Sequence, residues 1–123
     1  MEAMQIVRVF TGDDQRSHLA EVSLPFDRSG PLAATRALTS KGVRFIELPA
    51  GYDSPLHNAP ARQIVIFLEG ECELTTGAGA RWRGARGDIL LADDVEGEGH
   101  AFRVLKGPLR ALFIPLPLDA SPY

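Results

Sequence analysis

The residues of this chain best suited to chemistry are two histidines and the polar side chains near them. His57 lies in a segment that runs from Gly51 to Gly70, and His100 follows the pair Gly87-Asp88 after an acidic turn. An imidazole titrates close to neutral pH, so it can take up and return a proton, and its neutral nitrogen binds divalent transition metals. The two histidines therefore indicate either acid–base catalysis or a metal site.

The spacing of the first segment resembles the first part of the sequence signature of the cupin superfamily. In many cupins this part holds a Gly, a His, a second His two positions later, a Glu and a closing Gly. Here Gly51, His57 and Gly70 keep their places, whereas Ala59 replaces the second His and Gln63 replaces the Glu. The resemblance therefore includes a departure at two positions where cupins hold a metal ion.

The second part of the cupin signature is a Gly-Asp pair, an apolar strand, a turn and a His, and residues 87–100 keep this order. The resemblance covers about residues 43–116 and is greatest to small single-domain bacterial cupins, most of them uncharacterised. It implies an all-β fold, the cupin-type double-stranded β-helix or jelly-roll barrel. On this basis residues 1–123 form a single cupin domain, whose N-terminal strands within residues 1–30 could pack across a dimer.

Carried over to this chain, the resemblance places His57, Gln63 and His100 in the interior of the barrel. His57 and His100 would be the catalytic residues, and Gln63 would orient a substrate oxygen. Phe67 has the strand parity of Gln63 and is expected to line the same interior, where Tyr52 adds aromatic surface. These residues predict a pocket for a small organic molecule.

Arg62 and His18 each leave two alternatives open. In a regular strand Arg62 points opposite to Gln63, outward or into a dimer interface, whereas after a bulge it would face the pocket mouth and bind a substrate carboxylate. His18 lies far from both motifs in the sequence. It is either a surface histidine of an N-terminal strand or a third imidazole that reaches the pocket.

The implied metal ligands are His57, Gln63 and His100, and the metal would be Fe, Mn, Ni, Cu or Zn. A Gln carbonyl oxygen coordinates more weakly than a carboxylate and offsets none of the charge of the cation. The expectation is therefore either no cofactor or a weakly bound divalent transition metal.

Two further features have simple interpretations. The acidic residues 93–98 lack the spacing of an EF-hand calcium loop and are expected to form a solvated turn beside the barrel mouth. Cys72 lies between Glu71 and Glu73, whose charges would raise rather than lower the pKa of a thiol. We therefore expect it to fill a strand and not to act as a nucleophile.

The elements that must position these residues are short β-branched and apolar runs, separated by Gly, Pro, Asp and Ser. A helix is expected at most over one or two turns within Leu32–Leu38. The predicted strands are Gln5–Phe10, His18–Leu24, Val43–Leu48, Gln63–Leu68, Cys72–Thr75, Ala80–Trp82, Asp88–Leu91, Ala101–Leu105 and Leu109–Ile114.

Two continuously apolar runs predict further packing partners. Residues 64–68 are apolar at every position, so both faces of that strand should be covered, one by the barrel interior and one by a second sheet or a partner subunit. The prolines within residues 112–118 confine that run to an edge or a strand end. Together the two runs predict a homodimer that buries sheet edges.

Composition limits the partners and the location. A net charge of −3 and a pI of about 5.5 argue against nucleic acid and against a membrane surface, which both attract basic faces. A single cysteine fits a reducing compartment. Residues 1–5 lack the features of a signal peptide, and no run approaches the roughly 18 apolar residues of a membrane span. A cytoplasmic location is expected.

These observations leave several functions open. The first is a small-molecule enzyme that uses acid–base chemistry, of the isomerase, cyclase or lyase type, with or without a weakly bound metal. The second is a non-catalytic ligand-binding cupin with a degenerate metal site, and a third is a metal-dependent dioxygenase. A purely structural or interaction protein is the remaining alternative.

Overall fold

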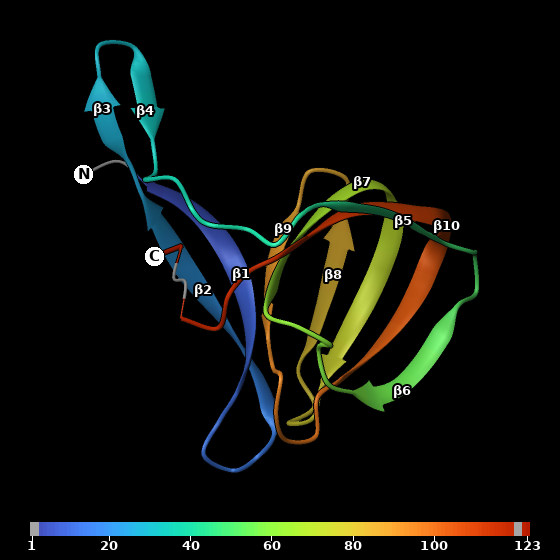
Figure 1. Cartoon of the computed structure of the whole chain (residues 1–123). Coiled ribbons are helices and arrows are strands. Elements are labelled where there is room, and N and C mark those ends of the chain that lie inside the picture. Colours follow the sequence, from blue (N-terminus) through green and yellow to red (C-terminus); the bar gives the residue numbers. More distant parts are fainter. Residues whose placement is uncertain (1–2, 120–121) are drawn as a thin grey trace.

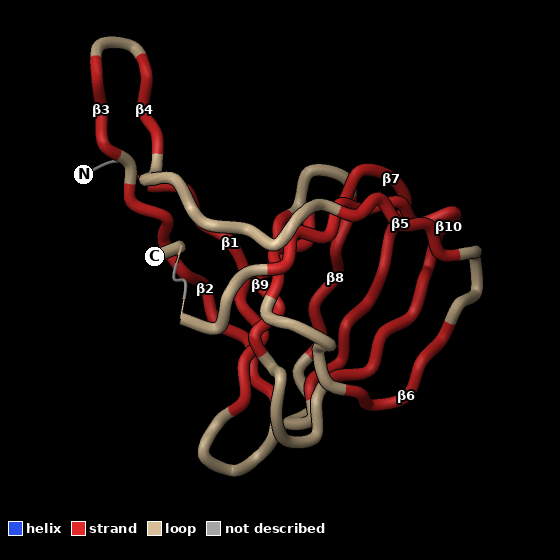
Figure 2. Tube along the Cα trace, in the orientation of Figure 1, coloured by secondary structure: helices blue, strands red, loops and turns tan. Residues whose placement is uncertain are grey.

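The protein is all-β. A computed structural model describes residues 3–119 and 122–123. Strands account for 62% of these residues, and none of them is helical (Figure 2). The described chain thus contains no helix with the length and apolar character that a membrane span requires.

The described strands follow one another through short turns along the whole chain. In chain order they are β1 (Ala3–Thr11), β2 (Ser17–Pro25), β3 (Asp27–Ser29), β4 (Leu32–Ala34), β5 (Arg44–Leu48), β6 (Asp53–His57), β7 (Gln63–Thr76), β8 (Arg81–Ala85), β9 (Ile89–Asp93) and β10 (His100–Pro115).

All but β3 and β4 of these strands belong to one mixed sheet with the order β2-β1-β9-β7-β10-β5, in which β6 pairs with β10 and β8 with β7. The β1–β9 pair is parallel, and the other pairs are antiparallel. Strands β5 to β10 curve around one another, while the β1–β2 hairpin and the separate β3–β4 hairpin extend to one side (Figure 1). The predicted all-β class is confirmed.

Two long strands replace four shorter predicted ones. We expected breaks near Gly70 and near Gly107, but β7 and β10 continue through both positions and pair with each other along their length. Register shifts occur in β10 between Val104 and Ala111, opposite Gly70. Because Gly70 adopts a φ of 87°, the strand can turn there without ending.

The predicted turn of helix within Leu32–Leu38 is wrong. Residues Leu32–Ala34 form β4, which pairs with β3 across a turn at Gly30, whose φ is 60°. Strand β6 was also not predicted, because Asp53, Ser54 and Pro55 are typical of loops. It pairs with the start of β10 instead of standing alone.

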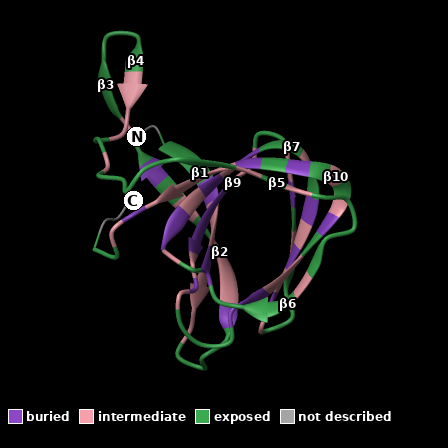
Figure 3. Ribbon diagram, turned by 45° about the vertical axis from the view of Figure 1, so that its right-hand side comes forward, coloured by how far each residue is buried: buried purple, intermediate pink, exposed green. Residues whose placement is uncertain are grey.

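The core consists of two clusters on opposite faces of the sheet. The larger cluster includes Val65, Phe67 and Leu109, and the smaller one holds Ile6, Leu24, Leu91 and Leu116 with Ile64 packed against it. Buried residues are concentrated on β7, β9 and β10, whereas β6 is largely exposed (Figure 3). The outer face of the apolar run 64–68 is therefore covered in part by this chain's own β1–β2 hairpin and C-terminal segment.

The prolines of the C-terminal apolar run were expected to confine it to a sheet edge or a strand end, and the second alternative is observed. Strand β10 ends at Pro115, but before that point Leu112 pairs with Ile66 of β7 on one side and with Phe45 of β5 on the other. The run is a strand end and not an edge. The homodimer stays a prediction.

A pair of glycine substitutions tests the turn within β7. Gly70 and Gly87 have nearly equal φ values, 87° and 91°, but a Cβ at Gly70 would lie 2.6 Å from two backbone oxygens, whereas a Cβ at Gly87 meets open space. Gly87→Ala should lower the free energy of unfolding by about 1 kcal/mol through backbone strain alone. Gly70→Ala should lower it by about 3 kcal/mol, because steric overlap is added to that strain.

The measurement is urea unfolding followed by circular dichroism, with Gly87→Ala as the control for backbone strain. Equal losses in the two variants would contradict the close packing of β7 against the irregular part of β10.

Candidate functional site

A cavity of about 430 Å³ lies between the curved strands β5, β6, β7, β9 and β10. Most of its wall is apolar, and includes Ile46, Val65, Phe67, Phe102, Leu109 and Phe113. Its polar lining is provided by Tyr52, Ser54, His57, Asn58, Gln63 and His100. Apolar walls with a few polar groups are typical of a site for a small organic molecule.

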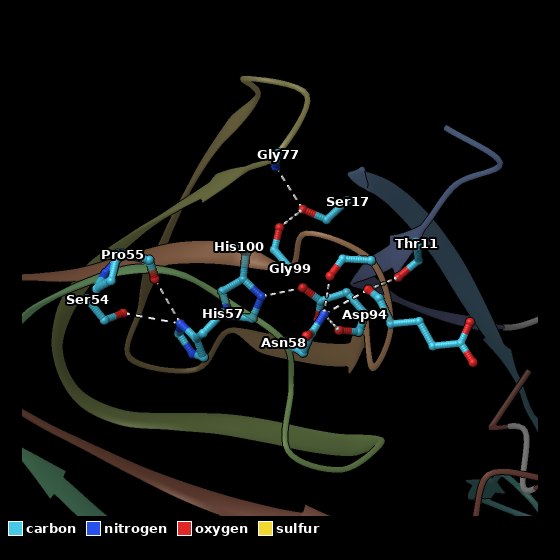
Figure 4. Close-up of polar contacts among 12 residues, drawn as sticks. Thr11, Ser17, Ser54, Pro55, His57, Asn58, Gly77, Asp94, Gly99 and His100 are labelled. Carbon is cyan, nitrogen blue, oxygen red and sulfur yellow. Dashed lines mark hydrogen bonds and ion pairs between the residues drawn. The ribbon is translucent and has the colours of Figure 1, made fainter. Parts of the chain in front are cut away.

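His100, the first residue of β10, is held by a buried carboxylate. Its Nδ1 lies 2.5 Å from Oδ2 of Asp94, which follows β9 and is 0% exposed (Figure 4). A carboxylate accepts the hydrogen bond, so Nδ1 carries a proton, and in the neutral ring Nε2 keeps its lone pair. The His100 ring forms no other hydrogen bond with the described residues, so Nε2 is the nitrogen available to a molecule in the cavity.

His57 is held in the same tautomer by a different acceptor. It ends β6 in an exposed position, and its Nδ1 lies 3.1 Å from the carbonyl oxygen of Pro55 and 3.4 Å from Oγ of Ser54. A carbonyl oxygen cannot donate, so the Pro55 contact assigns a proton to Nδ1, and in the neutral ring Nε2 again keeps its lone pair. The two rings lie 4.8 Å apart between centroids, and their Nδ1 contacts lead in opposite directions (Figure 4).

The turn between β9 and β10 brings the two histidines together. Gly99 has a φ of 75°, and a Cβ there would overlap the backbone of His57 and Asn58. The side chain of Asn58 donates to the carbonyl oxygens of Glu96 and Gly97 at 2.8 and 2.9 Å, which fastens the turn to the end of β6. Close backbone contact thus sets the separation of the imidazoles, as is typical of glycine at such positions.

Gln63, the first residue of β7, is a buried amide that faces the cavity. Its exposed fraction is 6%, and no described residue forms a hydrogen bond with its side chain. Its amide donors and carbonyl acceptor are therefore open to a ligand.

The structure brings most of the predicted site residues to this one cavity. His57, Gln63 and His100 line it together, and so do Phe67 and Tyr52. Phe67 is 2% exposed, whereas Tyr52 is 39% exposed. Their roles in catalysis and ligand binding stay predictions.

Arg62 is the exception: it points away from Gln63, as expected for a regular strand, and the alternative in which it faces the pocket mouth is wrong. It is absent from the cavity lining and is buried on the opposite face of β7 from Gln63. Its Nε lies 3.2 Å from Oδ1 of Asp93, and its Nη1 donates to the carbonyl oxygen of Leu118 at 3.0 Å. The strand parity was as expected, but the chain's own C-terminal segment covers this face, so Arg62 anchors that segment instead of a substrate.

His18 lies outside the cavity, as the surface alternative predicted. Its Nε2 is 2.9 Å from Oδ1 of Asp14, on a side chain that is 36% exposed. The hydrogen bond from His18 lowers the pKa of Asp14. The pair closes the β1–β2 turn and is not part of the site.

Asp94 is the site residue that sequence reasoning missed. We expected residues 93–98 to form a solvated turn, which holds for Glu96 and Glu98 but is wrong for Asp94. Its Oδ1 is buried and lacks a hydrogen-bond partner among the described residues, an arrangement that concentrates at functional sites. One signal in the sequence could have indicated this burial. The Asp93-Asp94 pair directly follows an apolar strand, and because successive side chains point to opposite faces of a sheet, one of the two should point inward.

Cys72 fills the core, as predicted. It is 0% exposed, and burial raises the pKa of its thiol to about 12, with a smaller contribution from the charge of Asp88. The neighbouring carboxylates Glu71 and Glu73, which we expected to cause this shift, are not its source.

The donors in the cavity fit a divalent metal ion poorly. Nowhere in the described ranges do three His, Cys, Asp or Glu side chains converge as metal ligands would. His57, Gln63 and His100 would offer two neutral imidazoles and a neutral amide, and Asp94 contacts the far side of the His100 ring. Because this set supplies no negative charge to a cation, we derive no step through a metal.

Comparisons with known proteins assign neither a family nor a function. No family model matches the chain, and no curated protein matches it. Among solved structures, the chain is similar to a conserved protein of unknown function from Streptococcus pyogenes, with 20% sequence identity and a TM-score of 0.49. That similarity covers 68% of this chain and 69% of the other.

Substitution of His100 tests its pairing with Asp94. His100→Ala leaves a buried carboxylate without its donor, so it should lower the free energy of unfolding by about 3 kcal/mol. His100→Gln keeps an N–H donor for the carboxylate and should lose less than half of that amount. Urea unfolding of both variants measures the difference, and equal losses would contradict a pairing that stabilises the fold.

The raised pKa of the Cys72 thiol predicts that the stability of the protein depends on pH in the alkaline range. The pKa of the folded thiol, about 12, exceeds its ordinary value of 9.0, so above about pH 9 the unfolded chain releases a proton that the folded chain keeps. The free energy of unfolding should therefore fall as the pH rises through this range, and less steeply in Cys72→Ala. Chemical unfolding at a series of alkaline pH values measures both slopes, and parallel slopes would contradict the prediction.

Proposed function

We propose that this chain is a small cupin whose jelly-roll barrel encloses the cavity, and that it catalyses proton transfer on a small organic molecule bound there. The observation that carries the proposal is the His100 imidazole, whose Nδ1 donates to the buried Asp94 and whose Nε2 is left for the cavity. The spacing of Gly51, His57 and Gly70 supports the choice of fold.

His100 is the proposed general base. Its Nε2 would remove a proton from a carbon next to a carbonyl group, and the imidazolium that forms would be stabilised by the Asp94 carboxylate on its other nitrogen. The low exposure of this pair strengthens that stabilisation, because water screens the charges little.

Gln63 and His57 complete the proposed mechanism. The Gln63 amide, which has no partner within the described chain, would donate to the substrate oxygen as negative charge develops on it. His57, at the exposed end of β6, would return a proton to the product or exchange it with solvent. Isomerisation, cyclisation and elimination beside a carbonyl all need these steps.

A second candidate is a non-catalytic ligand-binding module. Ala59 is 5% exposed and packs in the larger core cluster, at the position where the cupin signature has a second His. This replacement favours the loss of an ancestral metal site. The metal-dependent dioxygenase is less favoured than either candidate, because two imidazoles and a neutral amide would bind its metal only weakly.

Deuterium exchange tests the proposed catalysis. We suggest the neutral bicyclic ketone 2-tetralone in D₂O, with loss of its α-proton signal followed by NMR. The protein should accelerate this exchange, and His100→Gln should reduce the acceleration about 100-fold, in line with the usual contribution of a general base. His18→Gln is the matched control and should leave the rate unchanged, because His18 lies outside the cavity.

The same samples separate the candidates. Equal exchange by the protein and by the double variant His57→Gln, His100→Gln would contradict the proposed catalysis. Binding of 2-tetralone without exchange would favour the non-catalytic module.

A further inference from the structure

We infer that the cavity takes a neutral, mainly apolar molecule whose polar end is a hydrogen-bond donor of the phenol or enol type. This inference rests on the proposed function and narrows its substrate class. An enol is the hydroxyl tautomer of the ketone that the proposed base would deprotonate, so the two agree chemically.

The hydrogen-bond directions at the polar end of the cavity favour a donor. Asp94 and Pro55 each occupy the Nδ1–H of one imidazole, so both Nε2 atoms present lone pairs. The ring centroids are 4.8 Å apart, so a hydroxyl group beside the rings can donate to one of the two Nε2 atoms. A ketone or an ether can accept from the Gln63 amide but leaves both Nε2 acceptors unpaired, at a cost in affinity.

The charge around this end disfavours an anion. Within the described ranges, the residues that line the cavity include no Lys, Arg, Asp or Glu. Asp94 lies directly behind His100 and is completely buried, so its negative charge is poorly screened. A carboxylate or phosphate group would be desolvated there without a cation to pair with.

The apolar part of the cavity wall indicates which skeleton the ligand carries. Phe67, Phe102 and Phe113 line the cavity together with aliphatic side chains, and the volume of about 430 Å³ lies within the usual range for small-molecule sites. Aromatic walls pack well against a flat ring. The structure therefore favours a cyclic or aromatic skeleton that carries one hydroxyl group.

Three naphthalenes of similar size test the inference by isothermal titration calorimetry on the full chain. They are 2-naphthol, which donates, 2-methoxynaphthalene, which cannot donate, and 2-naphthoate, which is anionic. At neutral pH 2-naphthol should bind at least about tenfold more tightly than either of the others, the difference expected for one paired acceptor in a buried site.

His57→Phe should reduce this preference several-fold, because it removes one acceptor at an exposed position where folding does not depend on it. His18→Phe, outside the cavity, should leave the preference unchanged.

The outcomes distinguish this inference from the proposed function. Equal affinity for 2-naphthol and 2-methoxynaphthalene would overturn the preference for a donor, and tighter binding of 2-naphthoate would overturn the preference for a neutral molecule. In both cases the cavity would still be a small-molecule site. Binding of none of the three would overturn the proposed function itself.

Discussion

The contact between Asp94 and His100 is the constraint on which the rest of the site depends. A carboxylate with no exposure is stable only beside a donor, and here the donor is the first residue of β10. The backbone carbonyl of Asp94 also accepts from the amide of Ala59 at 3.1 Å. One residue thus joins the end of β9 to the start of β10, where His100 lies, and to the segment that connects His57 of β6 to Gln63 of β7.

The part of the fold and site that could be predicted depends on local signals. Glycine spacing located the turns, and Gly51, Gly70 and Gly87 all have positive φ values that other residues rarely adopt. The motif also located His57, Gln63 and His100 at one cavity. Asp94 was not predicted because a carboxylate in an acidic run is usually solvated, and its burial depends on the side-chain contact with His100. The strand parity of Arg62 was predicted, but its partners Asp93 and Leu118 lie far from it in the sequence and gave no local signal.

The two histidines share a tautomer but differ in their access to water. His57 is exposed at the end of β6, whereas His100 is 7% exposed and has its carboxylate partner. Little of His100 is open to solvent, whereas His57 is exposed to it. This division is suited to chemistry in which one proton is kept for the same molecule while another is released.

The adjacent aspartates Asp93 and Asp94 serve opposite faces of the sheet. Asp93 pairs with Arg8 of β1 at 2.7 Å and with Arg62, which in turn binds the carbonyl oxygen of Leu118, while Asp94 holds His100. A single peptide bond therefore connects the anchor of both chain ends to the support of the proposed base. The orientation of the proposed base therefore depends on the packing of both chain ends. If one end failed to pack, Asp94 would shift with Asp93, and the imidazole of His100 would be misaligned although the sequence motif is intact.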